Sequence, residues 1–118
     1  MKNFSRIGEA LKYIDAHLDE PVTLEALAEK YYLSPFYFHK VFSSIVGKPL
    51  AAYIRDRRVL YACKLLCTTD KTILDIALDC GFQSHQSFAR AFRRVQGVSP
   101  GAYRARGDQP DIISADDL

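Results

Sequence analysis

The sequence predicts an all-α fold in which two helix–turn–helix units are joined by one long helix. Apolar residues recur through most of the chain at the spacing of a helix face, and no stretch alternates as a β-strand would. A series of motifs within residues 23–53 also recurs within residues 72–103, at an offset of 49 or 50 residues. A chain of 118 residues is long enough for one compact core or for two very small ones, and the repeat favours two.

The first unit is expected over about residues 5–48 and contains three helices. The apolar face of the first helix consists of Ile7, Ala10, Leu11, Ile14 and Leu18. Thr23 is a suitable N-cap for a short second helix. Ser34 and Pro35 predict the start of a third helix, because serine caps a helix and proline suits its first position. Gly47 is expected to end that helix.

A long helix is predicted over about Leu50 to Thr68, and a second unit follows over about residues 70–106. The second unit repeats the caps, the buried phenylalanines and the closing residues of the first. The matched pairs are Thr23 and Thr72, Ser34 and Ser84, Phe38 and Phe88, Phe42 and Phe92, Gly47 and Gly97, and Tyr53 and Tyr103.

A tight turn is expected between the two repeated helices of each unit. A small residue, Ala28 or Ala77, stands where these helices must cross closely. Gly81 follows Ala77 by four residues and suits the positive φ that such a turn often needs. Tyr32 has that place in the first unit, where a positive φ would strain a tyrosine by about 1 kcal/mol or more. We therefore expect the first turn to have a different shape.

The second helix of each repeat, residues 34–46 and 84–96, is predicted to have an inward apolar face and an outward polar face. The inward residues are Phe38, Val41, Phe42 and Ile45 in the first, and Phe88, Ala91, Phe92 and Val95 in the second. The outward candidates are Phe36, His39, Lys40 and Ser43 in the first, and His85, Gln86, Ala89, Arg90, Arg93 and Arg94 in the second. Arginine and lysine pair with guanine, glutamine pairs with adenine, and phenylalanine or alanine can contact a thymine methyl group.

These outward faces predict two helices that read bases in the major groove of DNA. Arg93, Arg94 and the helix N-termini are expected to contact phosphates. The long helix spans about 28 Å, whereas successive major grooves on one side of B-DNA lie ~34 Å apart. One chain can therefore reach two adjacent grooves without a dimer, and any shortfall requires the DNA to bend.

Charge is distributed unevenly along the chain. The net charge is +2, from 16 Lys and Arg residues and 14 Asp and Glu residues. All 16 basic residues but only 10 of the acidic ones lie within residues 1–107, which gives that part +6. Residues 108–118 have four acids and no base, and we interpret them as an acidic tail or a linker to a further domain. The cationic part suits a polyanionic partner.

Several classes of protein are excluded. No apolar run reaches about 18 residues, and no signal-peptide core follows Met1, so we expect a cytoplasmic protein that does not enter a membrane. Cys63, Cys67 and Cys80 form no CxxC pair, which argues against a disulfide framework and a zinc site. We expect buried, inert thiols, no catalytic residue, no metal, no cofactor and no enzymatic activity.

Three stretches of the second half form a specific signature. They are Arg58-x3-Ala62-x2-Leu65-Leu66, Ile73-x2-Ile76-Ala77-x3-Gly81-Phe82-x-Ser84-x3-Phe88-x-Arg90-x-Phe92, and Gly97-x-Ser99-Pro100-x2-Tyr103-Arg104. With these stretches the chain closely resembles the AraC/XylS family of bacterial transcription regulators, over about residues 5–106. It is most similar to the small members of the MarA and SoxS type, which bind DNA as monomers and bend it.

The resemblance implies an AraC-type DNA-binding domain over residues 1–107, with about seven helices in two homeodomain-like subdomains. The base-contacting positions that it implies are Phe36, His39, Lys40, His85, Gln86, Ala89 and Arg90, in agreement with the outward faces. It also implies double-stranded DNA and RNA polymerase as partners, and a monomer for a fragment of this size. Activation of transcription is favoured over repression.

One interpretation of a different class stays open. The same faces, with Phe36 and Tyr37 as the only exposed aromatic residues, would suit a helical protein-interaction module that does not bind DNA. Arginines 55, 57 and 58 likewise suit either phosphate contacts or ion pairs within the protein. Binding that weakens steeply as salt rises would favour DNA over a protein partner.

Overall fold

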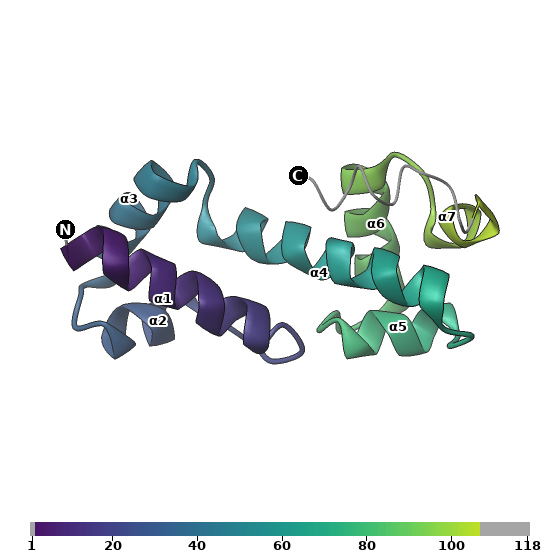
Figure 1. Ribbon diagram of the computed structural model, residues 1–118, viewed down its shortest axis with the longest axis horizontal. Coiled ribbons are helices and arrows are strands. Elements are labelled where there is room, and N and C mark those ends of the chain that lie inside the picture. Colours follow the sequence, from purple (N-terminus) through teal and green to yellow (C-terminus); the bar gives the residue numbers. More distant parts are fainter. Residues whose placement is uncertain (1, 107–118) are drawn as a thin grey trace. The chain divides into compact units, whose positions relative to one another are not determined.

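Seven helices make up the part of the chain that the computed structural model describes, residues 2–106 (Figure 1). They are α1 (Lys2–Ala16), α2 (Leu24–Lys30), α3 (Pro35–Val46), α4 (Leu50–Thr68), α5 (Ile73–Asp79), α6 (His85–Gln96) and α7 (Pro100–Arg106). Within these residues there is no strand. The predicted all-α fold is therefore confirmed, and the long helix begins and ends at the predicted residues.

The helices belong to two compact units that divide between Arg55 and Asp56, within α4. The first unit contains α1, α2, α3 and the start of α4, and the second contains the rest of α4 with α5, α6 and α7. Each unit has its own cluster of buried apolar side chains. Because α4 supplies residues to both clusters, each unit uses a different part of the same helix as one wall of its core.

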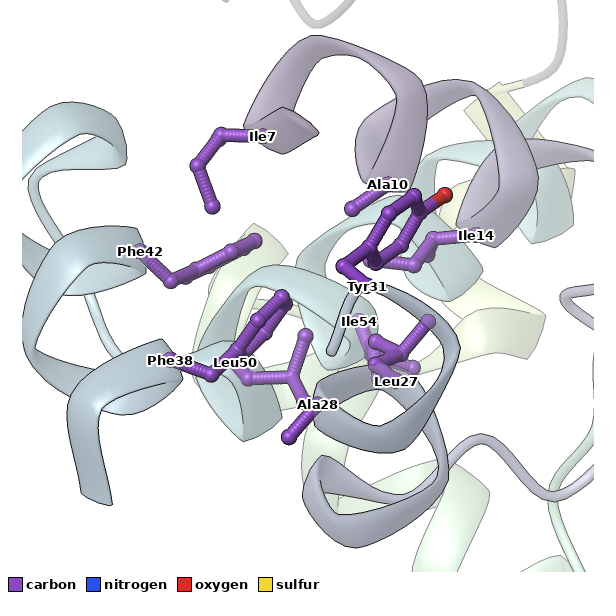
Figure 2. Close-up of a cluster of buried hydrophobic side chains, with 10 residues drawn as sticks. All are labelled: Ile7, Ala10, Ile14, Leu27, Ala28, Tyr31, Phe38, Phe42, Leu50 and Ile54. Carbon is purple, nitrogen blue, oxygen red and sulfur yellow. The ribbon is translucent and has the colours of Figure 1, made fainter. Parts of the chain in front are cut away.

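The core of the first unit is drawn in Figure 2, where side chains of α1, α2, α3 and α4 point toward one another. Phe38 and Phe42 are fully buried as predicted, and the Phe42 ring meets the Tyr53 ring edge-on at 5.8 Å between centroids. Ile45 was expected inside but is 38% exposed. At 100° per residue Ile45 lies between the buried Phe38 and the half-buried Val41, so the helical spacing alone does not account for its exposure.

The core of the second unit is a chain of aromatic contacts. Phe88 and Phe92 are fully buried, with ring centroids 5.6 Å apart, and Phe92 lies 5.4 Å from the Tyr103 ring of α7. Phe82 packs on Phe88 from the turn before α6, at 5.2 Å. The three ring contacts hold α6 between the preceding turn and α7, and so fix which face of α6 remains outside.

The short helices begin at the predicted caps. The side-chain oxygens of Thr23, Ser34, Thr72 and Ser84 each accept a hydrogen bond from the backbone N–H three residues later. Each bond satisfies one of the unpaired amide groups at a helix start. One boundary differs, because α1 ends at Ala16 and Leu18 lies in the following turn, where the His17 N–H bonds to the Ile14 carbonyl.

The two helix–turn–helix turns have the same shape, contrary to expectation. Tyr32 has φ of +59° and Gly81 has φ of +93°. The N–H of Leu33 bonds to the Ala28 carbonyl at 2.9 Å, and in the second unit the N–H of Phe82 bonds to the Ala77 carbonyl at 2.9 Å. The helix crossing therefore imposes a left-handed residue on both turns, and the tyrosine adopts it despite the strain.

We expect Tyr32→Gly to raise the free energy of unfolding by about 0.5–1 kcal/mol. The substitution removes the left-handed strain of about 1–2 kcal/mol, and the greater freedom of glycine in the unfolded chain offsets part of that gain. Because the Tyr32 side chain is 91% exposed, little packing is lost. Urea unfolding followed by circular dichroism measures the change. Gly81→Ala is the matched control and should destabilise; a loss of stability in Tyr32→Gly would contradict the strain.

Candidate nucleic-acid interface

The outward face of α3 is formed mainly by Phe36, His39 and Lys40, all of which are exposed. Phe36 is 76% exposed, an unusual position for a phenylalanine with no apolar neighbour to cover it. The start of α3 is held by the Ser34 cap and by a 2.9 Å hydrogen bond that the Asn3 amide donates to the Tyr37 hydroxyl. The first turn of α3 is thereby tied to α1.

Ser43 does not lie on the exposed face where the sequence placed it. Its residue is half-buried, and its Oγ is buried with no hydrogen-bond partner among the described residues. Ser44 is exposed instead. Ser44 stands four residues after Lys40 and matches Arg94 in the 50-residue repeat, so both the helical spacing and the repeat could have identified it.

The outward face of α6 is cationic. His85, Gln86 and Arg90 are exposed, as are Arg93 and Arg94 in the last turn. Ala89, the equivalent of His39, is half-buried. The guanidinium groups of the three arginines have no acidic partner among the described residues. They are therefore available to bind an anion, which sets them apart from the other arginines of this unit.

Two other arginines of the second unit, Arg58 and Arg104, have partners inside it. The Arg58 guanidinium lies over the Phe82 ring at 6.0 Å. The Arg104 guanidinium donates hydrogen bonds to the backbone carbonyls of Leu66, Thr69 and Lys71. These contacts give Arg58 and Arg104 structural roles.

The two units differ in charge. Residues 1–55 have seven Lys and Arg against six Asp and Glu, whereas residues 56–106 have nine against four. The excess positive charge is therefore in the second unit, where the unpaired arginines of α6 lie. The face of α3 is by contrast aromatic and nearly neutral, and the two faces suit different contacts with a nucleic acid: apolar contact with base edges at α3, and guanidinium pairing with bases or phosphates at α6.

More aromatic side chains are exposed than expected. Phe36 and Tyr37 are exposed as predicted, but Phe4, Tyr32 and Tyr61 are exposed as well, by 64%, 91% and 40%. Phe4 lies in the first turns of α1 and Tyr32 in the strained turn, where neither helix spacing nor a cap predicts burial. Exposure alone therefore does not distinguish Phe36 and Tyr37 from the other exposed aromatic residues as the centre of an interface.

The described residues show none of the groupings that metal binding or thiol chemistry would need. Cys63, Cys67 and Cys80 form no disulfide with one another, and Cys63 and Cys80 are buried. Burial, with a smaller effect of the Asp79 charge, raises the pKa of the Cys80 thiol to about 12, so the reactive thiolate does not form at neutral pH.

Residues 2–106 contain no group of three or more His, Cys, Asp or Glu side chains placed to hold a metal ion. No helix in that range is both long and apolar enough to span a bilayer. The acidic residues 108–118 lie outside the described part.

The chain matches the model of a family described as a helix–turn–helix domain, over residues 27–106. Among curated relatives, it is 41% identical over 100 residues to the regulatory protein PocR of Salmonella typhimurium, covering 85% of this chain but 33% of PocR. It is 39% identical over 100 residues to the regulatory protein SoxS of Escherichia coli K12, covering 94% of SoxS. The transcriptional activator AarP of Providencia stuartii is 41% identical over 100 residues, with 74% of AarP covered.

A solved structure is also similar to this chain in fold and sequence. The DNA-binding domain of the global transcriptional factor AdpA, crystallised with a target DNA, superposes with a TM-score of 0.81 at 36% sequence identity. The match covers 85% of this chain and 90% of the AdpA chain.

Proposed function

Because the chain belongs to the AraC/XylS family of helix–turn–helix transcription regulators, we propose that it binds double-stranded DNA with α3 and α6 in two adjacent segments of the major groove. Members of this family are regulators and not enzymes. The observation that carries the proposal is the pair of matched, capped helices, each with an exposed face, of which α6 has three arginines without an acidic partner among residues 2–106.

The proposed contacts follow from the chemistry of each face. On α3 the base-reading residues are Phe36, His39, Lys40 and Ser44, with Ser44 in place of Ser43 because the Ser43 hydroxyl is buried. On α6 they are His85, Gln86, Ala89 and Arg90, and Arg93 and Arg94 contact phosphates. Lys40 and Arg90 occupy equivalent positions in the repeat, so the two helices would enter their grooves in the same way.

The biological role is proposed on a different basis. AarP is named as an activator, and we propose activation of transcription for this chain too, with RNA polymerase as a second partner. We also propose that residues 1–107 form one DNA-binding domain that binds as a monomer, because α4 gives one chain two helix–turn–helix units. Such a regulator acts in the bacterial cytoplasm, where the DNA is.

Salt dependence tests the proposed function against a protein-interaction module. Three or four phosphate contacts should make the affinity for a duplex fall on the order of 10- to 100-fold between ~50 and ~200 mM salt, through counterion release. Fluorescence anisotropy of a labelled duplex measures this directly. A protein-interaction module that uses the exposed Phe36 would bind no duplex, and its affinity for a protein partner would change little over the same range. Failure to bind any duplex in a pool of random sequences would overturn the proposal.

We expect Arg90→Ala to weaken binding to the selected site by about 1–3 kcal/mol and to relax the preference at one base pair. Arg90 is exposed on the turn of α6 equivalent to Lys40 of α3, where a side chain can reach a base edge. Selection of bound sequences from a random pool, repeated with the variant, locates the relaxed position. Arg93→Ala is the matched control and should weaken all sequences equally. If Arg90→Ala also weakens all sequences equally, Arg90 contacts a phosphate.

A further inference from the structure

We infer that the exposed arginines of α6 form a docking surface for the acidic segment 108–118 of the same chain, which competes with DNA for that surface. The surface, here called the arginine patch, consists of Arg90, Arg93 and Arg94. The docking itself depends only on the opposite charges of the arginine patch and the acidic segment, and on the length of that segment. Its regulatory consequence rests on the proposed function, because it requires that the same arginines bind DNA.

The arginine patch has no acidic partner among the described residues. All three residues are exposed, they lie within five consecutive positions of one helix, and no acidic side chain among residues 2–106 pairs with them. Lys71, by contrast, is held by Asp79 at 2.6 Å. Three adjacent positive charges repel one another, so an acidic ligand at this surface is favoured over an empty one.

A segment tethered to the second unit is complementary in charge to the arginine patch. Residues 108–118 have four aspartates, at 108, 111, 116 and 117, and no basic residue. These four negative charges are close in number to the three positive charges of the arginine patch.

The acidic segment is long enough to reach the arginine patch. The acidic segment follows α7, and α7 packs on α6 within the second unit, where the Phe92 and Tyr103 rings are 5.4 Å apart. Twelve residues beyond Arg106 can extend about 40 Å, whereas α6 is about 18 Å long. The segment therefore reaches every arginine of the patch, and a short tether of this kind gives an effective concentration in the millimolar range.

Occupation of the arginine patch by the acidic segment would lower the apparent affinity for DNA by the fraction of molecules in which the patch is covered. Individual exposed ion pairs are weak, so the coverage is reversible and sensitive to salt. The effect falls on α6 and not on α3, whose outward face has a single cation, Lys40.

The test compares the full chain with a variant that keeps its length, Asp108→Asn/Asp111→Asn/Asp116→Asn/Asp117→Asn. Without DNA and at low salt, the amide and guanidinium NMR signals of Arg90, Arg93 and Arg94 should differ between the two proteins, and the differences should vanish by about 0.5 M salt. The signals of Lys40, an exposed cation at the equivalent position of α3, are the control and should coincide. The differences should not depend on protein concentration.

The second readout is the affinity for a random-sequence duplex, which should be about three- to tenfold higher for the variant at ~50 mM salt. Coinciding arginine signals in the two DNA-free proteins would overturn the docking, and so would differences that grow with protein concentration. Equal DNA affinities despite clear arginine shifts would overturn the competition. Arginine shifts in a protein that binds no duplex would overturn the proposed function and leave the docking supported, so the two failures are distinguishable.

Discussion

Replacing Phe92 with alanine should lower the free energy of unfolding of the second unit by about 3–5 kcal/mol, a large part of the stability of a domain this small. Phe92 has no exposed surface, and its ring contacts those of Phe88 and Tyr103. The substitution removes apolar burial and also leaves a cavity where α6 meets α7. Because these contacts set the orientation of α6, we expect DNA binding to weaken together with stability.

Hydrogen exchange measured by NMR or mass spectrometry locates the effect. Amides of α5, α6 and α7 should lose protection, because Phe92 belongs to a cluster that contains no residue of the first unit. Phe36→Ala is the matched control: it removes the same ring from the exposed face of α3 and should change stability by no more than ~0.5 kcal/mol. Similar losses in both variants would mean that Phe92 is not the buried contact described above.

The parts of the fold that depend on local chemistry could be predicted from the sequence. A serine or threonine cap needs only its own helix, and a repeated phenylalanine pair needs only the helical spacing, so Ser34, Ser84, Phe38 and Phe88 were placed correctly. The shape of the first turn was not, because local chemistry opposes it. The crossing of α2 and α3 over Ala28 imposes a positive φ on Tyr32, and tertiary packing outweighs the strain.

The candidate site shows a similar limit. An ideal helix wheel gives the side of α3 that faces outward, but it does not give how far the neighbouring elements cover its margins. On the wheel Ser43 lies among the outward residues and Ile45 among the inward ones, yet the Ser43 hydroxyl is buried and Ile45 is 38% exposed, so the helical spacing alone sets neither. The partners of the arginines could not be predicted either. Arg104 and Arg94 are both arginines near the ends of helices, and only the folded structure places backbone carbonyls within hydrogen-bond distance of Arg104.

Arg104→Ala should lower the free energy of unfolding by about 2–4 kcal/mol, although Arg104 is a polar, partly exposed residue. Its guanidinium donates to the carbonyls of Leu66 at 3.1 Å, Thr69 at 3.1 Å and Lys71 at 2.6 Å. These carbonyls lie at and just beyond the C-terminal end of α4, where helix carbonyls have no partner within the helix and the dipole favours a cation. One side chain thus joins α7 to the end of the long helix and to the connection that leads into α5.

A lysine variant separates the role of the directed guanidinium hydrogen bonds from the role of the positive charge. Arg104→Lys keeps the charge but cannot direct three N–H groups at three carbonyls, so it should recover less than half of the loss. Arg106→Ala removes the same charge from the same helix and should cost less, because Arg106 is exposed whereas Arg104 is half-buried. Thermal unfolding of the three variants ranks them, and equal losses for Arg104→Ala and Arg106→Ala would refute the capping role. If Arg104→Ala is much more destabilising than Arg106→Ala, hydrogen bonds to backbone carbonyls mark an arginine with a structural role. Among the described residues of this unit, Arg104 is tied to backbone oxygens and Arg58 lies over the Phe82 ring, whereas Arg90, Arg93 and Arg94 have no such contact and remain available for an anionic ligand.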